Sequence, residues 1–150
     1  GVDAPALFEA VASKLRIGEC SYEGLAQLHR VYVHLRLEAP RHSLTVLLSR
    51  HEAELQVAGL RQEPASRAQC DVSAALWRIG WDHDAPHFTA EGLSLGMAQP
   101  ASKVAVEFYG PTHYLAGYTD GVTHVLDGPT KAKERLLHSL GWDVVRVPYF

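Results

Sequence analysis

One carboxylate stands inside a hydrophobic run in the second half of the chain. The segment VAVEFYGPTHYL, residues 104–115, carries Glu107 among apolar neighbours and then breaks at Gly110 and Pro111 in front of His113. An ionised carboxylate on a buried strand is costly unless it is paired with a cation or coordinates a metal. We therefore expect Glu107 to pair with a cation such as Arg146, to meet water at the open end of a sheet, or to bind a metal.

The catalytic interpretation of Glu107 is metal-assisted hydrolysis of a phosphodiester. Mg²⁺ typically takes one or two protein carboxylates together with phosphate oxygens of the substrate. His113 is a candidate general base, because histidine titrates near neutrality. The alternative is a structural, hydrogen-bonding histidine at a strand end. Gly110-Pro111 favours that alternative, because glycine accepts unusual torsions and proline lacks the donor that would continue a ladder.

A second candidate site is a group of cations around an expected helix start. The segment Asp127-Gly128-Pro129-Thr130 is typical of a helix N-terminus, whose free backbone N–H groups favour an anion. We expect contacts to phosphate groups here; the alternative is a solvated helical face, with Glu134 diluting the positive field. The candidate residues for this binding are Lys131, Lys133, Arg135, Arg146 and His113.

Two other groups invite a functional interpretation and have simpler ones. Residues 82–87 hold two aspartates and two histidines, but no second ligand group at recognisable spacing accompanies them, so a polar loop is expected. Trp77, Trp81 and Trp142 could stack on unpaired bases. Burial is the expectation for Trp77, which lies beside core positions of a helix, and for Trp142, which follows a helix stop.

Alternation along residues 104–109 predicts the strand that carries Glu107. Val104, Val106 and Phe108 face one way, and Ala105, Glu107 and Tyr109 face the other. Both faces are largely apolar, which is typical of a central strand covered on both sides.

The remaining elements follow from periodicity and punctuation. Residues 1–60 predict amphipathic helices: one capped at Asp3 and ended by Gly18, one from near Ser21, and one after Pro40 that ends at Gly59. A capping box, Ser66 with Gln69, then starts a helix with Ala68, Val72, Leu76 and Ile79 on one face, ended by Gly80.

After Gly80 the pattern changes to short strands around residues 87–89, 93–98 and 104–109, a helix closed by Gly141, and a last strand at residues 143–147. This order predicts an α/β fold with a mixed sheet. We expect a helical region at residues 1–60 and an α/β domain at residues 64–150.

Composition limits the function classes. The formal net charge is −3, so no global field draws the chain to phosphate, and from Lys103 onward five Lys or Arg balance five Asp or Glu. Cys20 and Cys70 form no C-x-x-C pattern, which argues against a disulfide framework and a cysteine-rich zinc site. No apolar run is long enough for a transmembrane helix. The start lacks Met and a signal core, which is typical of a fragment or processed product.

Together, VAVEFYGPTHYL and LDGPTKAKERLLHSLGWDVVRVPYF resemble a RAP domain, the RNA-binding module abundant in apicomplexan proteins. The upstream segment PASRAQCDVSAALWRIG resembles the helix that precedes it, so the resemblance covers about residues 64–150. More weakly, the first sixty residues resemble the end of a helical-repeat array of the octotricopeptide-like kind.

The resemblance implies a fold and a degenerate site. RAP domains are similar to PD-(D/E)XK nucleases, a three-layer α/β/α fold with a four-stranded mixed sheet. Glu107 matches the glutamate of the nuclease motif, whereas Tyr109 stands at the lysine position and Gly96 at about that of the preceding acid. Both departures remove charge, so we expect Glu107, Tyr109, Gly96 and His113 to be a vestigial site without metal or cofactor.

The resemblance also implies a role. We expect a non-catalytic RNA-binding domain of an organellar protein, mitochondrial or alternatively plastid, in RNA processing, stability, translation or ribosome assembly. The partner would be RNA, with rRNA in a ribosomal particle as one case, and no membrane. The alternatives are a metal-dependent RNA endonuclease using Glu107 and His113, and a protein-interaction or structural module of a ribonucleoprotein that docks through the N-terminal helices.

Overall fold

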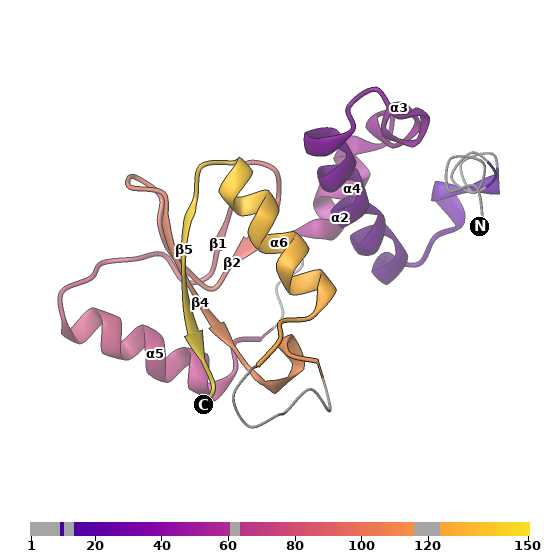
Figure 1. Ribbon diagram of the computed structural model, residues 1–150. Coiled ribbons are helices and arrows are strands. Elements are labelled where there is room, and N and C mark those ends of the chain that lie inside the picture. Colours follow the sequence, from indigo (N-terminus) through magenta and orange to yellow (C-terminus); the bar gives the residue numbers. More distant parts are fainter. Residues whose placement is uncertain (1–9, 11–13, 61–63, 116–123) are drawn as a thin grey trace. The chain divides into compact units, whose positions relative to one another are not determined.

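The computed structural model describes residues 10, 14–60, 64–115 and 124–150 (Figure 1). The chain divides into two compact units, Gly1–Arg61 with Ala90–Gly92, and Gln62–Thr89 with Leu93–Phe150. The helix expected from Asp3 lies mostly outside the described residues. None of the helices in the described ranges is long and apolar enough to cross a bilayer.

The first unit is helical. A short 3₁₀ helix, η1 (Ile17–Glu19), precedes α2 (Tyr22–Glu38), α3 (Ser43–Ser49) and α4 (Glu52–Gly59). The hydroxyl of Ser21 accepts a hydrogen bond from the Gly24 N–H at 3.1 Å, which caps α2 where the sequence predicts its start. The buried core is formed by Ile17, Tyr32, Leu44, Leu48 and Leu55.

The single helix expected after Pro40 is wrong, because the chain breaks at Arg50 and His51 into α3 and α4. In one straight helix, residues seven apart lie about 10 Å apart along the axis. The break folds the two short helices so that Leu48 and Leu55, both fully buried, enter the same core as Tyr32.

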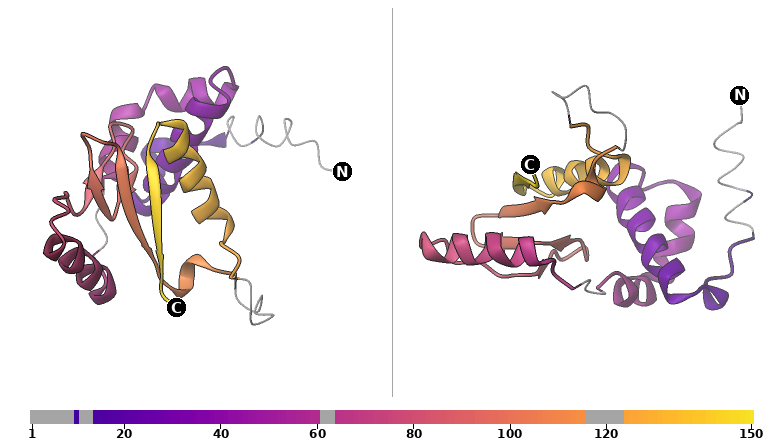
Figure 2. Two further views of the ribbon diagram at one scale, coloured as in Figure 1. Left: turned by 60° about the vertical axis from the view of Figure 1, so that its left-hand side comes forward. Right: turned by 90° about the horizontal axis from the view of Figure 1, so that it is seen from below.

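The second unit is α/β, as predicted. It contains α5 (Arg67–Arg78), β1 (His87–Phe88), β2 (Ser94–Leu95), β3 (Met97–Gln99), β4 (Val104–Tyr109), η2 (Pro111–His113), α6 (Gly128–Ser139) and β5 (Asp143–Pro148). Strands β3, β4 and β5 form a mixed sheet in that order, with β3 antiparallel and β5 parallel to β4. Figure 2 shows α5 and α6 on opposite faces of this sheet.

The expected strand at residues 93–98 is divided at Gly96. Strands β1 and β2 form a separate two-stranded sheet, so β3, β4 and β5 make three strands where the resemblance implies four. The division has a local cause, since the Gly96 N–H donates to the Glu107 carboxylate and not to a neighbouring strand.

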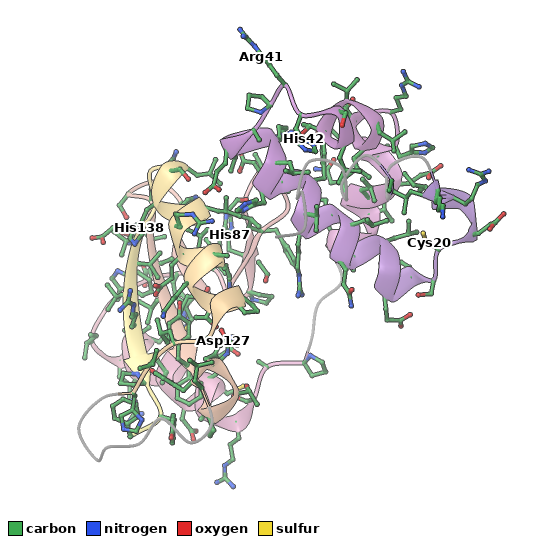
Figure 3. The ribbon with its side chains drawn as sticks, turned by 45° about the vertical axis from the view of Figure 1, so that its right-hand side comes forward. Cys20, Arg41, His42, His87, Asp127 and His138 are labelled. Atoms are coloured by element: carbon green, nitrogen blue, oxygen red, sulfur yellow. The ribbon has the colours of Figure 1, made fainter. Side chains whose placement is uncertain are left out.

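The predicted helix boundaries in this unit are confirmed. Ser66 Oγ accepts from the Gln69 N–H at 3.2 Å, and Asp127 Oδ1 accepts from the Thr130 N–H at 2.8 Å. Asp127 thus caps α6 at its first turn, and His138 lies in its last turn (Figure 3). His138 Nδ1 lies 3.1 Å from the carbonyl oxygen of Trp142. Gly80 and Gly141 follow their helices at φ +80° and +83°, a region that favours glycine.

Helix α5 packs less tightly than its sequence pattern predicts. None of its residues is buried, and Trp77 is 52% exposed, so the expected burial of Trp77 is wrong. Ile79, which directly follows the helix, is 78% exposed. Small residues such as Ser73 and Ala74 face the sheet, leaving a groove of about 360 Å³ lined also by Gly96 and Met97. Trp142, by contrast, is buried as predicted.

Candidate nucleic-acid interface

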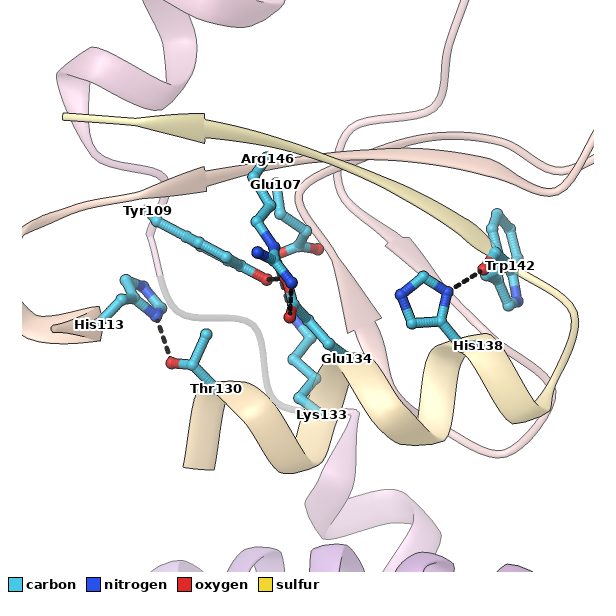
Figure 4. Close-up of polar contacts among 9 residues, drawn as sticks. All are labelled: Glu107, Tyr109, His113, Thr130, Lys133, Glu134, His138, Trp142 and Arg146. Carbon is cyan, nitrogen blue, oxygen red and sulfur yellow. Dashed lines mark hydrogen bonds and ion pairs between the residues drawn. The ribbon is translucent and has the colours of Figure 1, made fainter. Parts of the chain in front are cut away.

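Glu107 lies on β4, and both its carboxylate oxygens accept hydrogen bonds. Its side chain is buried, and Oε1 accepts from the Gly96 N–H at 2.9 Å. Oε2 accepts from Lys133 Nζ on α6 at 3.0 Å (Figure 4). The parallel register does place Arg146 beside Glu107, as strand pairing would suggest. A cation does lie beside Glu107, as expected, but it is Lys133 and not Arg146, because Arg146 pairs with another acid.

That acid is Glu134, the neighbour of Lys133 on α6. Arg146 Nε and one terminal nitrogen donate to its two carboxylate oxygens at 2.5 and 2.6 Å, and the Tyr109 hydroxyl donates to Oε1 at 2.9 Å (Figure 4). Glu134 is 5% exposed, whereas the Arg146 side chain is 54% exposed. This bidentate geometry makes a stronger ion pair than a single hydrogen bond would.

The pair perturbs its neighbours in directions that follow from burial and charge. Burial, followed by the hydrogen bond and negative charge of Glu134, raises the pKa of Tyr109. Hydrogen bonding to Glu134 raises the pKa of Arg146 despite partial burial. Tyr109 is therefore a neutral donor at any physiological pH, and it stands where the nuclease pattern has a lysine.

His113 connects the end of β4 to the start of α6. Its Nδ1 lies 3.0 Å from Thr130 Oγ1, its carbonyl accepts from the Asp127 N–H at 2.9 Å, and its ring stacks on that of Tyr109 at 4.9 Å. Burial alone would raise the pKa of Asp127, but the hydrogen bonds from Thr130 outweigh it and lower that pKa. These contacts match the hydrogen-bonding role that a histidine at a strand end predicts.

Gly110 ends β4 without needing a glycine-specific backbone. Its φ is −72°, and an added Cβ would meet only Phe108 at 3.8 Å. The expectation of unusual torsions there is wrong; Pro111 and the turn of η2 suffice to end the strand.

Gly96 reaches Glu107 through its backbone only. A Cβ at this position would lie 3.2 Å from Gln69 Nε2 on α5 and 3.3 Å from the Val106 carbonyl. A side chain would therefore point toward α5, whereas Glu107 faces α6. Of the four residues of the expected vestigial site, Glu107, Tyr109 and His113 lie along the α6 face, and Gly96 contributes an N–H.

The cations expected to contact RNA fall into two groups. Lys133 and Arg146 are held in the ion pairs described above, whereas Lys131 and Arg135 are exposed on α6. RNA contact stays a prediction for all of them. The structure adds that Lys133 and Arg146 would reach a phosphate only by sharing or leaving an acid.

The polar loop at residues 82–87 is held by ordinary hydrogen bonds. His83 is buried, with Nε2 2.8 Å from Ser73 Oγ and Nδ1 2.9 Å from the Trp81 carbonyl, and His87 lies 3.3 Å from Asp84. Across the described ranges, no group of three or more His, Cys, Asp or Glu side chains could hold a metal ion.

Sequence reasoning missed the role of Glu134. The sequence predicts that Glu134 only dilutes the positive charge of a helix face, whereas its carboxylate accepts hydrogen bonds from both Arg146 and Tyr109. A signal was present, because Glu134 lies three residues before Leu137 and therefore beside one edge of the apolar face of the helix.

The family model of the RAP domain matches residues 106–150, from β4 through β5. This match contains both ion pairs, His113 and the cations of α6. No curated protein matches the chain.

Proposed function

We propose that this chain, whose residues 106–150 form a RAP domain, is a non-catalytic RNA-binding module of an organellar RNA-metabolism or ribosome-associated protein. The observation that carries the proposal is the family match, since RAP domains are generally non-catalytic RNA-binding domains. The relation to the PD-(D/E)XK nuclease fold is part of the proposal and is supported by the mixed sheet with helices on both faces.

The contacts of Glu107 support the non-catalytic part. Both its carboxylate oxygens accept hydrogen bonds, and a metal would have to share this carboxylate with the Lys133 ammonium, whose positive charge opposes a second cation. Tyr109, two residues on, offers a neutral hydroxyl directed at Glu134 and no charge for an attacking oxygen.

Mitochondrial location, with plastid as the alternative, is proposed from the resemblance alone. The same holds for a role in RNA processing, stability, translation or ribosome assembly, with rRNA as one candidate partner. The helical first unit, which resembles the end of a repeat array, would supply either further RNA contacts or docking to a protein.

The charge arrangement supports weak binding by this chain. The charges of Lys133 and Arg146 are matched by Glu107 and Glu134, and the side chains of Lys131 and Arg135 are exposed on α6. Each phosphate contact to a single strand changes the salt slope of log affinity by about 0.7. We therefore expect a slope of roughly 1 to 2 and an affinity weaker than micromolar at physiological salt.

Fluorescence anisotropy of labelled single-stranded RNA at several salt concentrations tests this. The double variant Lys131→Gln, Arg135→Gln should weaken binding and flatten the salt slope. The matched control Arg78→Gln, an exposed cation on α5 across the sheet from α6, should change neither. Absence of RNA binding at low salt would refute the proposal; submicromolar binding at physiological salt would refute the weak-binding part.

The nuclease alternative predicts a different result. Purified chain incubated with labelled RNA and Mg²⁺ or Mn²⁺ should leave the RNA intact under the present proposal. Cleavage that disappears in Glu107→Gln would establish the endonuclease instead.

A further inference from the structure

Four aromatic side chains from three segments of the chain meet beyond the ends of β4 and β5. Tyr114 follows η2, His124 precedes α6, and Tyr149 and Phe150 follow β5. The imidazole of His124 stacks on Phe150 at 3.7 Å between ring centroids, and Tyr114 lies 5.7 Å from Tyr149 and 5.6 Å from Phe150. We call these residues the four-ring cluster.

The fold itself holds the four-ring cluster in place. The Tyr149 N–H donates to the Tyr109 carbonyl at 3.0 Å, which continues the pairing of β5 with β4. Tyr114 pairs with Leu126 in an isolated bridge, and the Leu115 N–H donates to the Val125 carbonyl at 2.9 Å, so both chain segments beside the rings are anchored.

Three of the four rings are exposed although they touch one another, and Tyr114 is half-buried. Phe150 is 62% exposed, Tyr149 is 45% exposed, and His124 is also exposed. A cluster that served only to fill a core would bury these faces. The adjacent Leu115 is 43% exposed, which extends the apolar surface by one aliphatic side chain.

The charged side chains that act on Tyr114 are Arg146 and Glu134, and these two are paired with each other. Paired charges offer an anion little attraction at Tyr114, whereas an uncharged flat ring would meet the exposed aromatic faces of the neighbouring rings.

We infer that the four-ring cluster is a stacking surface for unpaired bases of single-stranded RNA. The inference rests on the proposed function, because RNA as the occupant comes from the RAP domain match, and all four rings lie within residues 106–150. Every base has a π face, so such stacking tolerates sequence. Bases inside a duplex are already stacked and offer no free face.

Binding assays with ring-removing variants test the inference. The double variant Tyr149→Leu, Phe150→Leu keeps apolar area but removes two ring faces, and it should weaken binding of single-stranded RNA roughly 5- to 150-fold for each stacked base lost. Ile79→Ala is the control, because it removes an exposed apolar side chain outside the cluster, and it should bind like the unmodified chain. A duplex of the same sequence should bind more weakly than the single strand.

The outcomes separate the two proposals. If the double variant binds like the unmodified chain while Lys131→Gln, Arg135→Gln loses affinity, the stacking surface is refuted and the RNA-binding function stands. Equal affinity for duplex and single strand also refutes the stacking surface. No RNA binding by the unmodified chain refutes both proposals.

Photocrosslinking gives a readout that does not depend on variants folding. A single-stranded oligonucleotide containing 4-thiouridine is irradiated with the unmodified 150-residue chain, and the crosslinked peptides are mapped by mass spectrometry. Crosslinks at Tyr114, His124, Tyr149 or Phe150 support the inference. Crosslinks confined to α5 or to the exposed face of α6 overturn it.

Discussion

Replacing Glu134 by glutamine should destabilise the second unit measurably. The substitution keeps the size of the side chain but removes the charge that binds Arg146 at two positions and accepts the Tyr109 hydroxyl. A hydrogen bond to a charged group contributes about 1.5–3 kcal/mol. Arg146 is half exposed and regains water when the pair is lost, so the net cost should be about 2 kcal/mol.

Urea unfolding followed by tryptophan fluorescence measures this cost in the right part of the chain. The three tryptophans, Trp77, Trp81 and Trp142, all lie in the second unit, so the signal reports that unit alone. With a urea slope of about 1–3 kcal/mol/M, the midpoint should fall by roughly 1 M.

Asp143→Asn is the control, because it removes an exposed carboxylate from the same unit and should change stability by less than about 0.5 kcal/mol. If Glu134→Gln also lies within about 0.5 kcal/mol of the unmodified chain, the pair does not stabilise the unit and the reasoning is refuted.

Two further predictions concern pH. Tyr109→Phe should reduce the free energy of unfolding by about 1–2 kcal/mol at neutral pH. Because burial raises the pKa of Tyr109, the unfolded chain ionises first above about pH 10, so the stability difference between the variant and the unmodified chain should shrink there. Urea unfolding that gives the same difference at pH 8 and pH 10.5 would contradict this. Asp127→Ala should cost about 1 kcal/mol by removing the cap of α6. Because the pKa of Asp127 is lowered in the folded state, its contribution to stability is present above about pH 4 and is lost as pH falls through the pKa of the folded chain. Asp127→Asn should retain most of the cap. A stability loss in Asp127→Ala that is the same at pH 7 and pH 3 would argue against this.

The sequence predicted the elements whose signals are local. The caps at Ser66 and Asp127 and the alternation around Glu107 depend on neighbours a few residues away, and these predictions are confirmed. The break at Arg50 has no comparable signal, since the leucine spacing across it suits a continuous helix and only packing against α2 decides otherwise.

The candidate site was predictable in its residues and less so in its pairings. A buried Glu107 required a partner, and the sequence suggested Arg146 as one such cation. The choice between Lys133 and Arg146 depends on how α6 crosses β4 and β5. The four-ring cluster was not predictable, because its members come from three segments that meet only after the strand pairing forms.

Strand β5 has a consequence for self-association. It borders only β4, so among the described residues its outer backbone edge has no strand beside it, and Val145 is 47% exposed there. Such an edge invites strand addition from other copies and aggregation. Pro148 withholds one N–H donor, and the charge of Arg146 interrupts the run of valines, so both residues oppose it. Arg146, which pairs with Glu134, therefore also opposes the pairing of this edge with a strand of another molecule.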